Sequence, residues 1–492
     1  MGLVSDFGRQ FSIYAKTLFP STGSTDVLPT VAPEDAERFS RYSLFWRFYM
    51  GQHWENPTRP DGEPYLTANY LQAFVDIGTY YLMNKPWQLV NTDKDYSDEK
   101  IPYLDEIWKN NKKPVYSIEK AQMGGVTGDA FTLIMPDPLT NLPKSYLVPS
   151  SFVLPVWHPT ERGVLVSGIV QFPLKMSSAG STDVMTVTVD SMRIDQYVNG
   201  ELVNSIDHRL GEPPLILTRN KLLSCSNSGV SDLQPVIDVQ RQFNRKFTDI
   251  GDIINHHAAP ITIVYGTKLK NLERGANKVW GGLPSHKEAK VENLNSLGDL
   301  KAGTEHLMFI QKVLHQLSFC PEIALGKEMD ISNTSALAIQ LLFGPLLLVT
   351  EAKHHSYGQG FMDENRIHLK WGIRLGLITA PSTQKELNKF YRAPVKFGVA
   401  LPRDDMLNLN KVINRAKNAL ITPEEMFEEL GVTNIEEYWN DIMSSIDEGT
   451  YPAMLLTAQE KLTNLGGVMR DGATNEQIDD MIVKESNSSG GK

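Results

Sequence analysis

Neighbouring histidines are the first residues in this sequence whose type and spacing could do chemistry. They form two pairs, His256–His257 and His354–His355, and imidazoles are common ligands of zinc. Both pairs fall in segments with helical patterns, where adjacent side chains point about 100° apart and cannot hold one ion together. No HExxH motif and no nearby cysteine completes a ligand set. We therefore expect no metal site, and interpret these residues as polar or helix-terminal histidines.

Nucleotide and acyl chemistry have sequence signatures that this chain lacks. Nothing matches the GxxxxGK[ST] phosphate loop, and Gly358-Gln-Gly360 has Asp363 where a dinucleotide fingerprint needs its third glycine. No GxSxG elbow places a nucleophilic serine, although a Ser-His-Asp triad built from distant residues stays open. The sequence predicts a protein that is not an enzyme and has no cofactor. An enzyme with an unrecognised active site is the alternative.

The composition is that of a folded, acidic protein in water. Of the 492 residues, 41% are hydrophobic and 22% charged, and the formal net charge is −10. Tight nucleic-acid binders are usually basic, because affinity comes from counterions that lysine and arginine release. The acidic balance therefore disfavours a protein that grips DNA, but not one along which DNA slides. The two cysteines, Cys225 and Cys320, lie far apart, which disfavours a disulfide framework and fits a reducing compartment.

Export and membrane signals are weak. The N-terminus MGLVSDFGRQ has no signal-peptide pattern, and Asp6 stands where a myristoylation motif needs serine or threonine. The most apolar run, residues 336–349, is interrupted by Gly344 and Pro345 and is shorter than the about 20 residues that cross a bilayer. We therefore expect no membrane association.

The first part of the chain predicts an α+β unit. Helical spacing covers residues 38–54 and 67–83, and a shorter helix is expected over 114–123. From Asp129 the hydrophobic period changes to two, which predicts short antiparallel strands. Asn199-Gly200 between two such runs is a strong hairpin signal, because both residues tolerate positive φ.

A long amphipathic helix is predicted over residues 231–256, with Ser231 as its N-cap and Pro235 in its first turn. A short β insert follows Pro260, and a second amphipathic helix covers 304–319. A polar loop (321–334) then leads into a helical pattern over 335–377, which we expect to break at Gly344-Pro345 because proline removes a helical hydrogen bond. A strand at 394–402, short helices from residue 404 and a low-complexity tail complete the chain.

This order of elements resembles the portal proteins of tailed phages of the long-tailed siphophage type, over roughly residues 70–446. Four features carry the resemblance: GVSD at 229–232, the β insert after Pro260, ALGKEMDISNTSALAIQ at 324–340, and VALPRDD at 399–405. The resemblance implies a structural subunit that forms a ring of about twelve copies around double-stranded DNA. The ATP chemistry of packaging would then belong to a separate motor.

The resemblance also implies the portal fold, an α+β architecture with a wing of helices and antiparallel strands, a helical-hairpin stem, a small β clip, a long kinked tunnel helix and an α-helical crown. The implied boundaries are 1–222 for the N-terminal wing, 223–258 for stem helix 1, 259–302 for the clip, 303–319 for stem helix 2, 320–334 for the tunnel loop, 335–403 for the kinked helix and return to the wing, 404–484 for the crown and 485–492 for a disordered tail.

Two groups of candidate residues are expected to face partners. The clip carries excess basic charge and a tryptophan, and is either a docking face or a solvated loop; its candidates are Lys268, Lys270, Arg274, Lys278 and Trp280. The apolar face of the first stem helix is expected to be buried partly between subunits, through Leu233, Val236, Phe243, Phe247 and Ile254. A helical hairpin with a β finger inside a monomer is the alternative.

Two further groups are expected near the DNA. The tunnel loop would narrow the channel and contribute net negative charge, through Glu322, Lys327, Glu328, Asp330 and Asn333. The kink at Gly344 and Pro345 would divide the long helix into a channel segment and a wing segment.

The expected partners are copies of the chain itself, a terminase motor, a head–tail adaptor, the major capsid and scaffolding proteins, and DNA that passes without sequence specificity. The implied location is one vertex of the virion, after assembly in the host cytoplasm. Another virion connector protein is the second alternative.

Overall fold

The computed structural model describes residues 33–59, 62–90, 97–161, 163–176, 182–258, 261–265, 290–294, 300–326 and 336–398, with the single residues 412, 414, 415, 418, 421, 426 and 444. The chain divides into two units, residues 1–400 and 401–492. All the elements below belong to the first unit. The predicted crown and tail lie almost entirely outside the described residues.

Four helices open the described chain: α2 (Pro33–Tyr49), α3 (Tyr70–Met83), α4 (Ser97–Asn110) and α5 (Lys113–Thr127). Asn69 caps α3, because its side-chain oxygen accepts a hydrogen bond from the backbone N–H of Gln72. The sequence pattern had predicted α2, α3 and α5, each with shifted ends, but not α4. Helix α4 contains Pro102 and buries Leu104 and Trp108.

Two antiparallel sheets follow, as the change to a period of two had predicted. The first has the order β3-β2-β9, and the second β4-β5-β6-β7-β8. Their strands are β2 (Asp129–Pro136), β3 (Pro143–Val148), β4 (Val153–Trp157), β5 (Leu165–Met176), β6 (Thr182–Val189), β7 (Arg193–Val198), β8 (Glu201–Asp207) and β9 (Leu215–Arg219). The hairpin at Asn199-Gly200 is confirmed: φ is 52° and 87° at these two residues, and Val198 pairs with Glu201.

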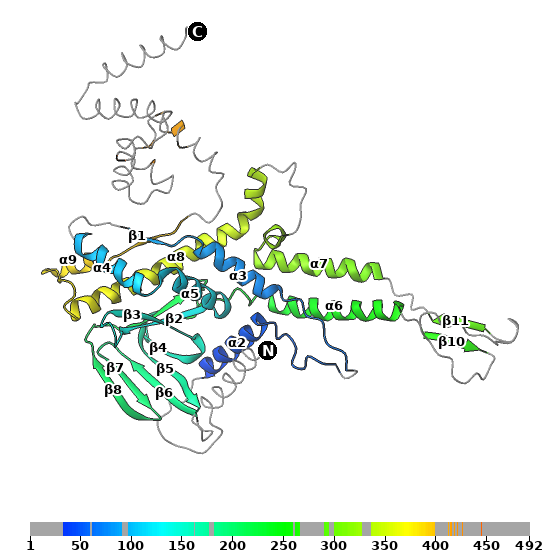
Figure 1. Cartoon of the computed structure of the whole chain (residues 1–492), viewed down its shortest axis with the longest axis horizontal. Coiled ribbons are helices and arrows are strands. Elements are labelled where there is room, and N and C mark those ends of the chain that lie inside the picture. Colours follow the sequence, from blue (N-terminus) through cyan, green and yellow to red (C-terminus); the bar gives the residue numbers. More distant parts are fainter. Residues whose placement is uncertain are drawn as a thin grey trace, which may run out of the picture. The chain divides into compact units, whose positions relative to one another are not determined.

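The predicted helical hairpin with a β insert is present as α6 (Ile237–Ala258), β10 (Ile261–Tyr265), β11 (Lys290–Leu294) and α7 (Leu300–Ser318). Figure 1 shows α6 and α7 lying side by side. Helix α6 begins at Ile237, later than the predicted start at Ser231. Ser231 is not its N-cap, because it lies six residues before the helix begins. Its hydroxyl instead accepts from the backbone N–H of Leu233 and donates to the carbonyl of Val126.

The long helix α8 (Ala336–Arg374) runs through Gly344 and Pro345 without the predicted break, and Pro345 lies inside it. Figure 1 shows its first turns steeply inclined to the remainder, as expected for a helix that contains a proline. Helix α9 (Gln384–Phe390) follows, and the short strand β12 (Val395–Lys396) pairs with β1 (Gln88–Leu89). The predicted strand at 394–402 is confirmed only in this short part.

Helix α8 is also the centre of the core. Tyr357 and Phe361 pack with Trp87 and Trp108 of the N-terminal helical region, while Trp371 lies in a second cluster to which both sheets contribute. Among the helices that the structure describes, none is long and apolar enough to cross a membrane.

Candidate assembly surface and its anchor to the core

The helical hairpin is joined to the core by the segment GVSD at 229–232, which passes very close to the end of α5. A Cβ added at Gly229 would lie 2.3 Å from the carbonyl oxygen of Gly128, and one added at Gly128, where φ is +92°, would lie 2.7 Å from the carbonyl oxygen of Gly229. The Gly229 N–H donates to Asp129 Oδ1 at 2.7 Å. Side chains cannot fit at this crossing, so both positions require glycine.

Asp232, at the end of this segment, holds the hairpin to α8 by charge. Its carboxylate lies 2.6 Å from Lys353 Nζ on α8 and 2.8 Å from Lys221 Nζ. Burial opposes ionisation of this carboxyl, but the two lysines outweigh burial and lower the pKa of Asp232 to about 2. The side chain is only 16% exposed, so solvent screens the pair weakly.

Asp232→Asn is expected to lower the free energy of unfolding by about 2 kcal/mol at pH 7, the equivalent of its pKa shift. Because the folded-state pKa is depressed, this stabilisation is present above the ordinary carboxyl pKa and is lost as the pH falls towards 2. Denaturant unfolding between pH 2 and 7 measures both effects. Asp249→Asn, at an exposed pair with Lys246, is the matched control; an equal loss there would contradict the anchoring role.

The five predicted stem residues fall into two groups. Leu233, Val236 and Phe243 are 0%, 0% and 4% exposed within the single chain, where they pack with α2, α3 and α5. Because these side chains are already buried in their own chain, they can bury little further surface area against a neighbouring subunit. This finding corrects their assignment to the subunit interface. Phe247 is 36% exposed and Ile254 48%, so the interface prediction narrows to these two.

Further exposed apolar side chains lie on α7, on the turn after it and on the first half of α8. Met308 and Phe309 are 66% and 63% exposed, and Leu341 and Leu348 are 71% and 70%. Sequence reasoning missed them, because it assigned one apolar face to each helix. The signal was the run Leu307-Met-Phe-Ile310, which holds more consecutive apolar residues than one face of a helix can bury. An exposed patch of this kind indicates a protein contact.

The other predicted residues are only partly described. Glu322 lies in the 3-10 turn η3 (Glu322–Leu325) after α7, and its charge adds to burial in raising the pKa of Tyr70. In α8, Gly344 is half-buried and Pro345 exposed. Outside the described residues lie Lys327, Glu328, Asp330 and Asn333 of the loop, and Lys268, Lys270, Arg274, Lys278 and Trp280 of the β insert.

His354, from the second histidine pair of the sequence, makes structural contacts. His354 Nε2 lies 3.2 Å from the carbonyl oxygen of Leu82, and its ring stacks on Phe397 with centroids 4.3 Å apart. No group of three or more histidine, cysteine, aspartate or glutamate side chains is placed to hold a metal ion in the ranges that the structure describes.

Comparison with models of known protein families identifies the family of this chain. The model of the family described as phage portal protein, SPP1 Gp6-like, matches residues 30–385. The chain belongs to this family of phage portal proteins, which is a structural class and not an enzymatic one.

Solved structures that are similar to the chain include two from gene transfer agent particles. One is from the neck of an empty gene transfer agent particle computed with C6 symmetry; it is 11% identical, with 85% of this chain and 98% of that chain covered and a TM-score of 0.48. The other is from the virion of a native gene transfer agent particle; it is 12% identical, with 87% and 99% covered and a TM-score of 0.43. No curated protein matches the chain.

Proposed function

We propose that this chain is the subunit of a ring-shaped portal at one vertex of a phage capsid, through which double-stranded DNA is packaged and ejected. The observation that carries the proposal is the apolar surface of α6, α7 and α8 that the single chain leaves uncovered, including Phe247, Met308 and Phe309. In a portal-family chain, the simplest way to bury such surface is a contact between different faces of successive copies. Repeated around an axis, that contact closes a ring.

The proposed ring is a conduit without catalytic chemistry of its own. A net charge of −10 per chain suits a channel along which DNA slides without sticking. The β insert between α6 and α7 is the proposed docking face for a terminase motor and later a head–tail adaptor, and the wing would contact the major capsid and scaffolding proteins. Such a subunit is assembled in the host cytoplasm and stays in the virion.

DNA packaging into capsid shells tests this function directly. Shells assembled from the phage's own capsid and scaffolding proteins, with or without this chain, would be given terminase, ATP and DNA. We expect nuclease-protected DNA only in shells that contain the chain. Equal protection without it would refute the proposed role.

Gly344→Ala together with Pro345→Ala is expected to give assembled particles that package DNA poorly. Removing the proline restores a helical hydrogen bond and favours a straight helix by about 3 kcal/mol. A straight α8 would change the direction of its first turns. Gly344→Ala alone is the matched control, because a Cβ there meets nothing within 4 Å. Wild-type DNA filling by the double variant would show that the bend of α8 is not needed.

Glu328→Lys together with Asp330→Lys is expected to slow packaging at low salt. We propose that the loop at 320–334 faces the DNA, so that two added cations per subunit would multiply phosphate contacts around the ring. Added salt should restore the rate because it screens these contacts. Packaging rates measured across salt concentrations test this prediction. A wild-type rate at low salt would show that the loop does not lie in the channel.

A further inference from the structure

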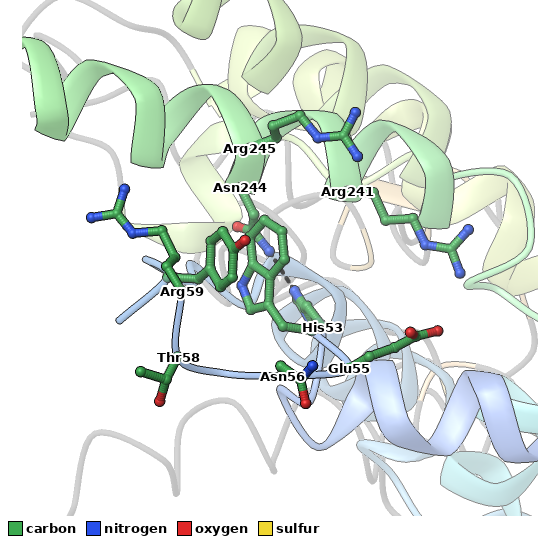
Figure 2. Close-up of a pocket in the computed structure, with 10 residues that line it drawn as sticks. His53, Glu55, Asn56, Thr58, Arg59, Arg241, Asn244 and Arg245 are labelled. Carbon is green, nitrogen blue, oxygen red and sulfur yellow. Dashed lines mark hydrogen bonds between the residues drawn. The ribbon is translucent and has the colours of Figure 1, made fainter. Parts of the chain in front are cut away.

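A pocket of about 560 Å³ lies beside α6. One wall is α6, and the other is the segment between α2 and α3. Its lining residues are His53, Trp54, Glu55, Asn56, Thr58, Arg59, Tyr65, Arg241, Asn244 and Arg245. Figure 2 shows the side chains of Arg241 and Arg245 extending from the same helix.

Hydrogen bonds to α6 hold the pocket's outer wall in place. The fully buried Asn244 bonds to His53 Nδ1 at 2.5 Å and accepts from the backbone N–H of Ala68 at 3.1 Å. Arg59 pairs with Asp252 of α6 at 2.5 Å. The wall is therefore fixed to the helix before any ligand arrives, which lowers the entropic cost of binding.

Two guanidinium groups of this pocket are open to an anion. Arg241 and Arg245 lie one helical turn apart on α6, and both are exposed. Arg241 pairs with Asp238 at 3.0 Å, but both side chains are solvent-exposed, so the pair is weak. Arg245 has no ion pair with any residue in the described ranges. Exposed arginines bind carboxylates through charge-assisted hydrogen bonds.

An aromatic surface adjoins the two arginines. The rings of Trp54 and Tyr65 are stacked, with centroids 4.2 Å apart and an angle of 14° between planes. Trp54 Nε1 donates to Thr67 Oγ1 at 2.9 Å, which holds the indole in position. Half-buried aromatic rings beside arginines are typical of the anchor positions of protein–protein contacts.

We propose that this pocket binds a short acidic segment of a partner protein, with a carboxylate held by Arg241 and Arg245 and the adjoining residue packed against Trp54. This goes beyond the ring and the DNA channel, because it adds a specific docking site for an acidic peptide. Asn56 and Thr58 also line the pocket and carry neutral hydrogen-bonding groups.

The charges around the pocket favour a peptide over nucleic acid. Glu55 lines the pocket, and the carboxylates of Asp238 and Asp252 lie next to two of its arginines. Duplex DNA carries about one negative charge per 1.7 Å, so phosphates beyond the first would meet these carboxylates. A peptide can place one or two carboxylates at the arginines and neutral residues elsewhere.

Binding of a labelled peptide to the full chain tests the site. The probe is fluorescein-labelled hexaglutamate, followed by fluorescence anisotropy at low salt, with labelled hexaglutamine as the neutral reference. We expect hexaglutamate alone to bind, and Arg241→Glu with Arg245→Glu to weaken it by about tenfold or more. Lys385→Glu with Lys389→Glu makes the same charge change, at the same spacing, on α9, and should leave binding within about twofold.

Two further arms keep the test decisive. Arg241 also lies over the Phe48 ring at 4.9 Å, so replacing it could disturb the fold. Arg245→Glu alone breaks no described pair and avoids this problem. It should still weaken hexaglutamate binding severalfold. Labelled heptathymidylate, with six phosphates, tests nucleic acid. Tighter binding of heptathymidylate than of hexaglutamate, equal losses in the α9 control, or no hexaglutamate binding at all would each overturn the proposal. None of these results depends on whether the chain forms rings.

Discussion

Phe247→Asp is expected to yield soluble, folded single chains in place of rings. Phe247 is 36% exposed on α6 and stacks on the buried Phe243, with ring centroids 6.0 Å apart. A carboxylate at this surface position leaves the fold intact, but in a subunit contact it would be buried without a partner. Burying a charged carboxylate without a partner costs several kcal/mol, and every contact around the ring would carry this cost.

Size-exclusion chromatography with light scattering, together with a thermal melt, measures both parts of this expectation. Phe247→Leu is the matched control, because it keeps the position apolar and should still assemble. If Phe247→Asp forms rings at the wild-type concentration, α6 does not contribute this face to a subunit contact. A low melting temperature would instead report a folding defect, and Ile254→Asp, at a position 48% exposed, would then repeat the test.

Glu364→Gln is expected to destabilise the core strongly. Glu364 Oε1 lies 2.6 Å from Lys120 Nζ, both side chains are 0% exposed, and the Tyr116 hydroxyl donates to the same oxygen at 2.9 Å. The neutral amide leaves the Lys120 charge buried without its partner. Breaking a buried pair in this way costs about 3–5 kcal/mol.

A variant without either charge distinguishes a lost ion pair from a packing defect. Lys120→Met with Glu364→Leu removes both charges and should be far more stable than Glu364→Gln, because replacing a whole buried pair by apolar groups is often neutral. Free energies of unfolding from denaturant titration give the comparison. Glu305→Gln, at the exposed and long contact with Lys301, is the control with an expected loss below about 1 kcal/mol. A loss of similar size in Glu364→Gln would contradict the account.

The sequence predicts the elements with strong local periodicity. The order of α6, the β insert and α7 follows from two amphipathic patterns flanking a short apolar run, and Asn199-Gly200 specifies its hairpin through positive φ at both residues. Helix α4 was not predicted, because Pro102 interrupts its helical pattern. The start of α6 was placed too early because Leu233 and Val236 continue the helical spacing, although the chain there forms turns.

Long-range contacts explain what the sequence could not predict at the site. A hydrophobic face shows that Phe243 and Phe247 are buried against something, but not whether the cover comes from the same chain. The structure shows Phe243 buried beside Tyr70 of α3 and leaves Phe247 exposed. The ion pairs Asp232–Lys353 and Lys120–Glu364 join residues 121 and 244 positions apart, a separation at which no sequence pattern pairs charges. The pocket beside α6 likewise needs a distant segment for its second wall.

Electron microscopy of the purified chain tests the central claim most directly. A portal subunit should appear as rings with a central hole, all of one diameter, with a particle mass that is a whole multiple of the 55.2 kDa chain. The rings should disappear in Phe247→Asp and persist in Phe247→Leu. Compact particles of one or two chains, with no hole at any concentration, would contradict the proposed portal.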